Sequence, residues 1–584
     1  MLVNRIIQAT NGASSIIHHV NRGTPQGGVL SPLLWVIALN GILLELNRGG
    51  VKVVAYTDDV VIAATGPFLS TVSEILEGTL GRLHAWATRS GLNVNPAKTE
   101  LILFTNRHKL PQFKLPSLDG KALSLTPSAK YLGVVLDNKL NWKANVEFRR
   151  QKAYIAYYTC QRIFSRNWGL NPKLVMWMYT AIIRPILTYG ALVWWPGLSR
   201  QYNVSKLRSI QRAASAGVTG AILNLIPIDL HLKEVAMKSA VRLRESGLWR
   251  TRHFGHGLII NQMQLNRTTD YIVGNLDFSC NVQVLFPSRR DWRRDRVAYR
   301  EKISLYTNGS KMDCGVGAGV YSKELGVALS LRLGNNTSIF QAEVLGILEA
   351  CKILGNRVGH SGKATIYSDS QAALLAIASP VTKSKLVGEC KVILRSVSQS
   401  NTVSLVWVPG HRNIEGNEKA DELAKAGAGL DESQAVALGC PLGVVQREIT
   451  THFLELARRR WSDIQTCKIA RKLWPDYNRA KTLDLLSRSR PEVFRILATI
   501  TGHWPIGKHA AKIGLPHNMI CRSCQLEDSE ESVQHLLCEC PGLSNIRHKT
   551  LGKHLVAELT DLSGATISEI GRFIRQWKWF DLAT

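Results

Sequence analysis

Residues 51–64 read VKVVAYTDDVVIAA, and two adjacent carboxylates, Asp58 and Asp59, stand at the centre of this otherwise apolar run. The flanking residues are mostly β-branched, apolar or aromatic, and neither Gly nor Pro interrupts them, which predicts buried β-strands. Carboxylates are costly in such a setting unless they are paired, hydrogen-bonded or bound to a metal. Thr57-Asp58-Asp59 is therefore either only the polar turn of a β-hairpin, or the tip of a hairpin that holds a divalent cation.

A glycine-rich turn precedes this hairpin in the chain. It lies in NRGTPQGGVLSPLLW, residues 21–35, where the glycines permit close approach of the backbone and a proline fixes the turn. Alone, such a turn before an apolar helix is a weak signal and is usually structural. After the hairpin come GLNVNPAKTELILF at 91–104 and KYLGVVLDNKLNW at 130–142, and this order strengthens the signal.

The ordered set resembles the palm of reverse transcriptases from non-LTR retrotransposons, and residues 168–195 resemble the thumb-side region that follows in those elements. The resemblance implies catalytic magnesium at the hairpin, because two-metal phosphoryl transfer needs converging carboxylates. It implies Asp58 as the principal ligand and Asp59 as its neighbour. The residues that it places at template, incoming nucleotide, triphosphate and primer end are Gly23, Gln26, Gly27, Lys98, Tyr131 and Gly133.

The start of the chain bears on this resemblance. In that family a further essential aspartate lies on a strand before the glycine-rich turn, whereas this chain starts at Met1, shortly before the turn. We therefore expect the fingers and the first carboxylate strand to be absent. The palm would then be partial and would not polymerise DNA unaided.

Four further blocks follow in order within residues 301–428. They read ISLYTNGSKMDCGVGAGV (303–320), SIFQAEVLGILEACK (338–352), ATIYSDSQAALLAI (364–377) and LVWVPGHRNIEGNEKADELAKAG (405–427). Each acidic residue has an ordinary interpretation: Glu343 as a solvated helix residue, Asp369 as a cap after a strand, and Asp421 as part of a charged helix face. Four blocks in this order make coincidence a poor explanation, and Asp369 follows a buried strand, where a carboxylate can face a cleft.

Together the blocks resemble type 1 ribonuclease H, an αβ fold with a mixed five-stranded sheet and covering helices. The resemblance implies endonucleolytic cleavage of the RNA strand of an RNA–DNA hybrid by two-metal hydrolysis, with Mg²⁺ or Mn²⁺. It implies that Asn308, Glu343, Asp369 and Asp421 are the metal ligands and that His411 assists proton transfer or product release.

Asn308 departs from the family pattern, which carries an aspartate that bridges both metals at this position. An amide offers one neutral oxygen where a charged carboxylate is wanted, so metal affinity and charge neutralisation should both fall. The sheet and the substrate groove need not change. We therefore expect this domain to bind hybrid better than it cuts it.

A cluster of cysteines and a histidine lies near the C-terminus, in CRSCQLEDSEESVQHLLCEC. Cys521, Cys524, His535 and Cys540 have a spacing that suits one tetrahedral zinc ion. Cys538 competes as the fourth ligand, since His535 and Cys538 are also neighbours on a helix. The ordinary alternative is a small core of reduced cysteines. Similar knuckles follow the nuclease in some lineages of the same elements, where they bind nucleic acid.

A basic, aromatic stretch precedes this cluster. Its composition suits phosphate contact and base stacking, although such a run is also commonly a solvated helix face. Its residues are Arg458, Arg459, Arg460, Arg471, Lys472, Trp461, Trp474 and Trp504.

The whole composition points to a polyanionic partner. The chain has 584 residues, a formal charge of +29 and a pI near 9.8, which indicates several domains and a nucleic-acid partner. The expected partners are an RNA–DNA hybrid, an RNA template and DNA. No secretory signal opens the chain, and Arg184 and Pro185 interrupt its apolar segment, so we expect no membrane partner. The expected location is intracellular, in the nucleus, the cytoplasm or both, and not secreted.

The sequence thus predicts a multidomain α/β protein. The expected domains are a partial palm (1–136), a helical thumb or connection (137–285), a basic linker (286–300), ribonuclease H (301–428), and a basic helical tail with a zinc knuckle (429–584, knuckle 521–540). The expected function is that of a retrotransposon-derived replicase fragment. The alternatives are a non-catalytic nucleic-acid-binding protein, repurposed from such an element, and a relic without selected function.

Overall fold

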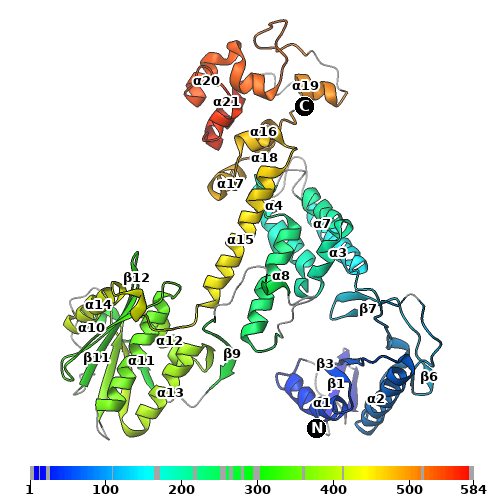
Figure 1. Ribbon diagram of the computed structural model, residues 1–584, viewed down its shortest axis with the longest axis vertical. Coiled ribbons are helices and arrows are strands. Elements are labelled where there is room, and N and C mark those ends of the chain that lie inside the picture. The colour runs from blue at the N-terminus through cyan, green and yellow to red at the C-terminus, as the bar shows by residue number, and fades with distance from the viewer. Residues whose placement is uncertain are drawn as a thin grey trace. The chain divides into compact units, whose positions relative to one another are not determined.

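The computed structural model of the chain divides into two compact units, residues 1–149 and 150–584 (Figure 1). It describes residues 5–11, 14–20, 27–107, 109–162, 171–214, 220–249, 258–261, 268–277, 282–293, 303–357, 362–410, 414–504, 506–514 and 519–577. No helix of the described residues is long and apolar enough to cross a membrane.

The first unit is built from short antiparallel hairpins and two helices. The hairpin that carries the two aspartates packs on α1, and Leu39, Leu46 and Val53 belong to the core between them. The elements are β1 (Arg5–Asn11), β2 (Ser14–Val20), α1 (Ser31–Asn47), β3 (Lys52–Tyr56), β4 (Asp59–Ala63), α2 (Leu69–Arg89), β5 (Ser117–Leu118), β6 (Lys121–Ala122), β7 (Ser128–Tyr131) and β8 (Val134–Asp137).

The hairpin is less buried than its composition predicts. β3 and β4 pair only with each other among the described strands, so each has one unpaired edge. In β3, Val53 is buried, whereas Val54 and Tyr56 are 49% and 61% exposed. On α1, Leu33, Val36 and Ile37 are also more than half exposed. Both the hairpin and α1 therefore present apolar side chains to solvent.

Helices from both ends of the second unit pack together. α15 (Leu442–Asp463) lies against α8 (Ile228–Glu245), although the nuclease-like segment separates them in sequence (Figure 1). α3 (Lys143–Gln161) begins in the first unit and ends in the second. The other helices before that segment are α4 (Pro172–Met178), α5 (Arg184–Thr188), α6 (Ala191–Trp194), α7 (Gln201–Ala214), α9 (Leu258–Asn261) and α10 (Arg289–Arg293). Those after it are α16 (Lys468–Leu473), α17 (Arg479–Leu486), α18 (Arg490–Thr501), α19 (Gly507–Lys512), α20 (Ser544–Leu551) and α21 (Ile567–Arg575).

A buried carboxylate joins these helices. Asp229 of α8 accepts hydrogen bonds from Arg208 of α7 at 3.1 and 3.2 Å and from Arg460 of α15 at 3.0 and 2.9 Å. Burial by itself raises the pKa of Asp229, but the hydrogen bonds and charges of the two arginines outweigh it and hold the pKa below its usual value. The ionised Asp229 therefore links α15 to the helices that precede the nuclease-like segment.

The central sheet has six strands in the order β10-β16-β14-β11-β12-β13. β11, β12 and β13 are antiparallel, while β14 and β16 continue the sheet in parallel. The bounds are β10 (Gln283–Leu285), β11 (Ile303–Met312), β12 (Gly315–Ser322), β13 (Val327–Leu333), β14 (Lys363–Ser368) and β16 (Thr402–Trp407). The five strands expected from the sequence are present, and β10 adds a sixth from the segment before the expected domain.

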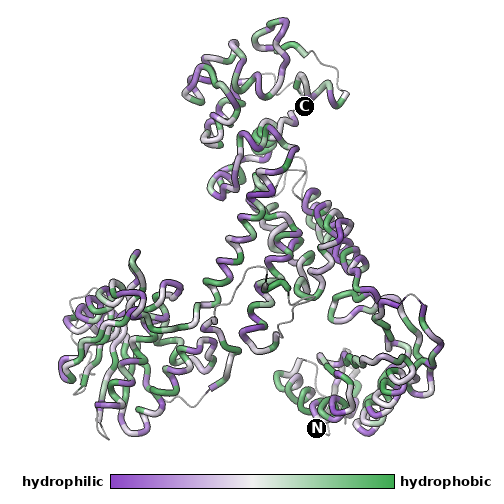
Figure 2. The backbone as a smooth tube through the Cα atoms, in the orientation of Figure 1, coloured by the Kyte–Doolittle hydropathy of each residue, from purple (hydrophilic) through white to green (hydrophobic). Residues whose placement is uncertain are grey.

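Helices cover both faces of this sheet. In β12, Val316, Ala318 and Val320 belong to the core shared with α11 (Ile339–Arg357) and α13 (Lys385–Ser400), along which hydrophobic residues gather (Figure 2). The alternate residues Gly317 and Gly319 face α14 (Glu415–Ala428), because a Cβ on either would lie 2.2 Å from its backbone. α12 (Gln371–Ala378) follows β14, and β15 (Val381–Ser384) pairs with β9 (Tyr271–Leu276).

We expect Asp229→Asn to loosen the helical body. The substitution leaves two arginines without their counter-charge, and because their side chains are 37% and 36% exposed, the loss should be that of charged hydrogen bonds, about 1.5–3 kcal/mol. Since its pKa is lowered, the stabilisation by Asp229 is complete above about pH 4 and is lost as the pH falls through the folded pKa. Hydrogen exchange of α8 and α15 at pH 7 measures this. The matched control is Asp476→Asn, whose carboxylate pairs with Arg458 of α15 but is 55% exposed. Equal exchange in the two variants would contradict the role of Asp229.

Candidate metal centres and nucleic-acid interface

The two aspartates of the first unit lie at the exposed tip of the β3–β4 hairpin. Thr57 adopts a positive φ of 51° there, and its carbonyl accepts a 2.6 Å hydrogen bond from the indole of Trp35. The Thr57 hydroxyl donates to Asp58 at 3.0 Å. Among the described residues, no third acidic, histidine or cysteine ligand atom joins Asp58 and Asp59 within 4.8 Å. The hairpin thus offers two solvated carboxylates but not a closed metal site.

The other expected polymerase residues differ in how the structure places them. Tyr131 ends β7, and its pKa is raised by burial and then by the charge of Asp59. Lys98 is exposed in the turn Pro96–Lys98, and Gly133 has a φ of 78°. Gly27 has a φ of 80° with open space around it. Gly23 and Gln26 lie outside the described residues.

The nuclease-like domain brings its acidic residues together at one end of the parallel strands. Thr307 of β11 pairs with Ser368 of β14 in parallel register. Asn308 and Asp369 are the next residues along the two strands, so they lie next to each other. Glu343 comes from α11, which packs closely on β11: a Cβ on Gly309 would lie 2.9 Å from the Glu343 nitrogen. Asp421 comes from α14 on the other face. His411 lies outside the described residues.

Glu343 is the most strongly perturbed of these groups. Its side chain is 6% exposed, and its pKa is raised well above the usual value. Burial is the largest cause, followed by the negative charge of Asp369, with a smaller contribution from Asp421; a hydrogen bond from the Gly309 backbone opposes them. Neighbouring carboxylates that disfavour one another's charge are typical of a catalytic or metal-binding site.

One atom of this site lacks a partner. The Oε2 atom of Glu343 is buried and makes no hydrogen bond. A buried carboxylate oxygen without a donor is costly, and a divalent cation would satisfy it together with Asp369. The residues therefore fit the magnesium that the resemblance implies. The acidic oxygens do not all lie within 4.8 Å of one another, and Asp421 pairs with Lys425 at 2.6 Å.

Two tryptophans support the loop that carries Asp369. The indole nitrogen of Trp407 donates to the Asp369 carbonyl at 3.0 Å, and that of Trp292 donates to the Trp407 carbonyl at 3.2 Å. Trp292 belongs to α10, in the segment interpreted from sequence as a linker, and its ring meets Tyr367 edge-on with centroids 6.2 Å apart. Tyr367 in turn stacks on Tyr306 at 4.8 Å. Sequence reasoning missed Trp292; its only signal was a tryptophan within a charged run.

The side chains of four residues in the cysteine–histidine cluster converge on one point. One atom from each of Cys521, Cys524, His535 and Cys540 lies within 4.8 Å of the others. The sulfurs of Cys521 and Cys540 are 3.8 Å apart, and His535 Nε2 is 3.4 Å from the Cys524 sulfur. His535 Nδ1 faces Glu539 at 3.6 Å, the kind of carboxylate partner that orients a ligating histidine. This donor set fits tetrahedral zinc.

Cys538 lies outside this group. It is fully buried, and burial is the main cause that raises the pKa of its thiol to about 11. Arg547 fixes the neighbouring turn, because its buried guanidinium donates to the carbonyls of Leu536, Cys540 and His554 at 3.2, 2.7 and 2.9 Å.

The structure corrects the interpretation from sequence of the basic stretch before the cluster. Trp461, Trp474 and Trp504 are only 6%, 2% and 4% exposed, so they cannot stack on bases. They fill the core because their large rings bury more apolar area than any other side chain. Most of the cations also have partners within the protein: Arg460 with Asp229, Arg458 with Asp476, Lys472 with Glu558, and Arg471 with the Ser462 carbonyl.

Comparison with known proteins identifies two segments. Residues 1–136 match the reverse transcriptase (RNA-dependent DNA polymerase) family, and residues 300–429 match RNase H. The chain is 28% identical over 193 residues to the Pol polyprotein of retrotransposable element R1 from Bradysia coprophila, covering 33% of this chain and 19% of that protein. It is 24% identical to an R1 Pol polyprotein from Nasonia vitripennis (33% and 58% covered). It is 25% identical to the RNA-directed DNA polymerase of mobile element jockey from Drosophila funebris (40% and 26%).

Solved structures give matches of lower similarity. A foamy viral protease-reverse transcriptase in complex with dsDNA is 20% identical with a TM-score of 0.19, covering 22% of this chain and 95% of that chain. RNase H1 from Halobacterium salinarum is 18% identical with a TM-score of 0.17, covering 21% and 96%.

The two family matches and the retrotransposon relatives confirm the resemblance drawn from the motifs. The chain carries a reverse transcriptase segment and an RNase H segment, and its relatives are Pol proteins of R1 and jockey non-LTR retrotransposons. The expected α/β fold class, with a mixed sheet and a Cys/His cluster near the C-terminus, is also confirmed. The chain spans between 19% and 58% of the length of the relatives named above.

We expect the tryptophan pair to position Asp369. Trp407→Phe keeps an aromatic ring but removes the donor to the Asp369 carbonyl, so Mn²⁺ affinity should fall about tenfold, as for other residues that orient a metal ligand. Trp292→Phe acts one step further away and should lower it by a smaller factor. Electron paramagnetic resonance of free Mn²⁺ measures both. The matched control, Trp177→Phe, changes a ring that is 58% exposed and should have no effect. Unchanged affinity in Trp407→Phe would exclude this role.

Proposed function

We propose that this chain binds RNA–DNA hybrids and that its RNase H domain hydrolyses the RNA strand slowly, with Asn308 as the limiting feature. The observation that supports this most is the buried, unpartnered Oε2 of Glu343 beside Asp369 and Asp421. A carboxylate that is buried, lies near other carboxylates and has an unsatisfied oxygen does not stabilise packing. A bound cation would offset all three costs. The domain's match to RNase H supports this substrate class.

The chemistry follows from the donors present. Magnesium, when bound, would lower the pKa of a coordinated water and stabilise the charge that develops on the phosphate in the transition state. Glu343 and Asp369 would hold the cation, and Asn308 would contribute a neutral amide oxygen where a third negative charge would bind more strongly. Asp421, held by Lys425, is available to a second cation only if that ion pair opens. The site thus favours substrate binding over turnover.

We propose that residues 1–149 descend from a polymerase palm and contribute template and primer contacts rather than complete catalysis. Asp58 and Asp59 lie at an exposed tip with no third ligand among the described residues. The exposed apolar face of α1 is consistent with a palm that packs against a further segment. A second candidate function, nucleic-acid binding without catalysis, is favoured by Asn308 itself.

The proposed partners are an RNA–DNA hybrid, an RNA template and DNA, inside the cell in the nucleus, the cytoplasm or both. The charge of +29 supports this, because phosphate contacts dominate the affinity of such proteins. We also propose that Cys521, Cys524, His535 and Cys540 hold structural zinc, which would order the turn that Arg547 supports.

We expect Asn308→Asp to raise cleavage of the RNA strand by orders of magnitude, since each roughly 1.4 kcal/mol of barrier is tenfold in rate. Hybrid affinity without metal should change little. The assay follows a labelled hybrid with Mg²⁺ and with Mn²⁺, which accepts similar ligands and should partly compensate in the wild type. Asn401→Asp is the matched control. It makes the same amide-to-carboxylate change at a remote residue, whose side-chain oxygen accepts a hydrogen bond from the Gly362 amide.

Three outcomes separate the candidates. Adding Asp369→Asn should abolish the gain from Asn308→Asp. Efficient cleavage by the wild type, with no gain in Asn308→Asp, would show that the amide suffices. Hybrid binding without cleavage in every variant would support the non-catalytic alternative.

We expect the purified chain to carry one zinc ion. Cys540→Ser should lose it, whereas Cys538→Ser should retain it, since Cys538 lies outside the group of four donors. Elemental analysis gives the stoichiometry, and Co²⁺ substitution reports the thiolate ligands in the visible spectrum. Chelation should unfold residues around the cluster, because metal binding supplies folding energy in so small a module. Retention of zinc by Cys540→Ser would reassign the fourth ligand.

A further inference from the structure

Four aromatic rings adjoin one another at the end of α18 and in α19. The centroid of the Phe494 ring on α18 lies 5.9 Å from that of Trp504, and the rings of His503 and His509 meet edge-on with centroids 5.3 Å apart. Gly502 ends α18 with a φ of 72°, and His503 and Trp504 follow it directly in the chain. The two ring pairs therefore form one group, which we call the ring cluster.

The rings of this cluster differ in their exposure. Trp504 is 4% exposed and belongs to the core, whereas Phe494 is 62% exposed. His503 is exposed and His509 is half-buried. Burial lowers the pKa of His509, and the charges of His503 and Lys512 lower it further, so its ring is neutral at pH 7. The cluster thus presents the Phe494 ring to solvent on a support of packed aromatic side chains.

The surroundings of the ring cluster are positively charged. Residues 479–514 hold seven lysines and arginines against two acids, Asp484 and Glu492. Both acids are already paired with Arg488, at 2.7 and 3.7 Å respectively. Lys512, the last residue of α19, is exposed. A polyanion is therefore the partner whose charge complements this surface.

The ring cluster is packed against the segment that carries the cysteine–histidine cluster. A Cβ on Gly507, the first residue of α19, would lie 2.1 Å from the carbonyl oxygen of Glu531. Glu531 is fully buried and pairs at 2.7 Å with Arg522, which follows Cys521 directly. Only glycine permits that approach, so α19 and the proposed zinc site belong to one packed body.

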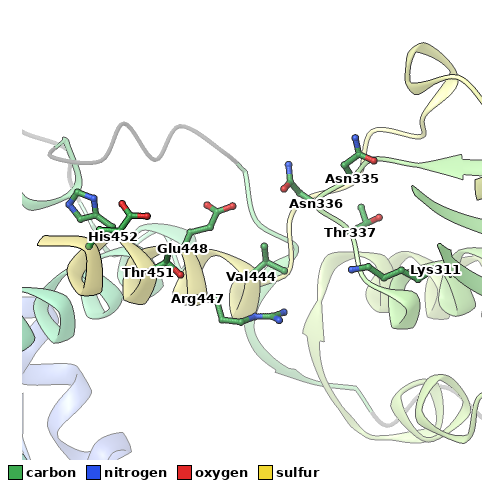
Figure 3. A pocket seen from close by; sticks show the side chains of 10 residues that line it. Lys311, Asn335, Asn336, Thr337, Val444, Arg447, Glu448, Thr451 and His452 are labelled. Atoms are coloured by element: carbon green, nitrogen blue, oxygen red, sulfur yellow. The ribbon is translucent and has the colours of Figure 1, made fainter. Parts of the chain in front are cut away.

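The cleft between the RNase H domain and α15 does not combine the same properties (Figure 3). It is lined by Lys311 and Arg447 but also by Glu448 and Glu455, which would repel a phosphate backbone. His452 is the only aromatic ring among the described residues that line it. The ring cluster, unlike this cleft, joins an exposed ring to a net positive charge.

Unpaired bases are the chemical groups that fit such a surface. Every base has a flat π-face, so it can stack on an exposed aromatic ring whatever the sequence. In a duplex each base is already stacked on its neighbours, so only a single strand offers its faces to a protein ring. Cations beside the ring can then contact the phosphates of the same strand.

We propose that the ring cluster is a binding site for single-stranded nucleic acid, in which an unpaired base stacks on Phe494 and Lys512 contacts a phosphate of that strand. RNA and DNA strands share this chemistry. The inference rests on the proposed nucleic-acid partners but not on the nuclease site, because the ring cluster lies outside residues 300–429, which match RNase H.

The first test measures binding of a fluorescein-labelled oligouridylate to the full chain by anisotropy, over a range of salt concentrations. Phe494→Leu should weaken binding about tenfold, the order expected for one stacked base, and should leave the salt slope unchanged. Phe494→Trp should restore the affinity, because it returns a stacking ring. Lys512→Gln should instead lower the salt slope by about 0.7, the value for one phosphate of a single strand.

Two controls isolate the ring. Phe68→Leu makes the same change at a phenylalanine that is 68% exposed outside the ring cluster, and it should alter affinity by less than about twofold. A blunt RNA–DNA hybrid, assayed without divalent metal, should bind Phe494→Leu as tightly as it binds the wild type, because its bases are already stacked. A deoxyuridine strand of the same length distinguishes the two sources of the ligand. A loss with both strands identifies stacking alone, and a loss with one identifies that strand.

Photocrosslinking tests where the base lies. A strand that carries one 5-iodouridine should crosslink on irradiation to the peptide that contains Phe494, as identified by mass spectrometry. Equal losses in Phe494→Leu and Phe68→Leu, an equal loss of hybrid binding, or crosslinks confined to other peptides would overturn the proposal. If the wild type binds neither the single strand nor the hybrid, the proposed nucleic-acid partners fail together with this site.

Discussion

The close packing of α11 on β11 is the constraint on which the nuclease domain depends. Gly309 allows the helix to approach until the backbone of Glu343 lies where a side chain would otherwise sit. That approach buries the Glu343 carboxylate near Asp369 and Asp421, raises its pKa, and leaves Oε2 without a donor. Ordinary packing would select an apolar residue at such a position. A carboxylate at such a position is costly unless a cation completes it, and this cost is the physical basis of the metal site that we propose at Glu343 and Asp369.

The order of the sequence blocks was enough to find the sheet and its acidic residues, because each block has a strong local period. It could not find β10 or Trp292. Gln283 pairs with Ser404 across more than a hundred residues, and no local pattern encodes a parallel pairing of that range. Trp292 stands in a charged run whose composition suggests solvent, yet its ring packs against Tyr367 beneath the loop of Asp369. The functional support for the site therefore extends before the segment that the motifs define.

The basic stretch shows where composition misleads. The arginines and tryptophans at 458–474 are as typical of a buried helical interface as of a nucleic-acid contact. The periodicity of the sequence does not show which face of the helix is covered by the rest of the protein. The partner that decides is Asp229, a buried acid more than two hundred residues away. Its ionised state needs Arg208 and Arg460, so these charges serve folding. The large positive charge of the chain is thus not a direct measure of its nucleic-acid surface, and only cations without such partners count toward it.

The position of α15 connects these observations. Its C-terminal half is held to α7 and α8 through Arg460 and Asp229, while the segment before its first turn is held to the nuclease through Gly439 and Val436. One continuous helix therefore spans from the sheet that carries Asn308 to the helical body. Because each turn of a helix is hydrogen-bonded to the next, a helix fixed at both ends acts as a rigid connection between the two parts that it joins. The place of α15 relative to the nuclease sheet is thus set by two separate packing interfaces, one at Asp229 and one at Gly439.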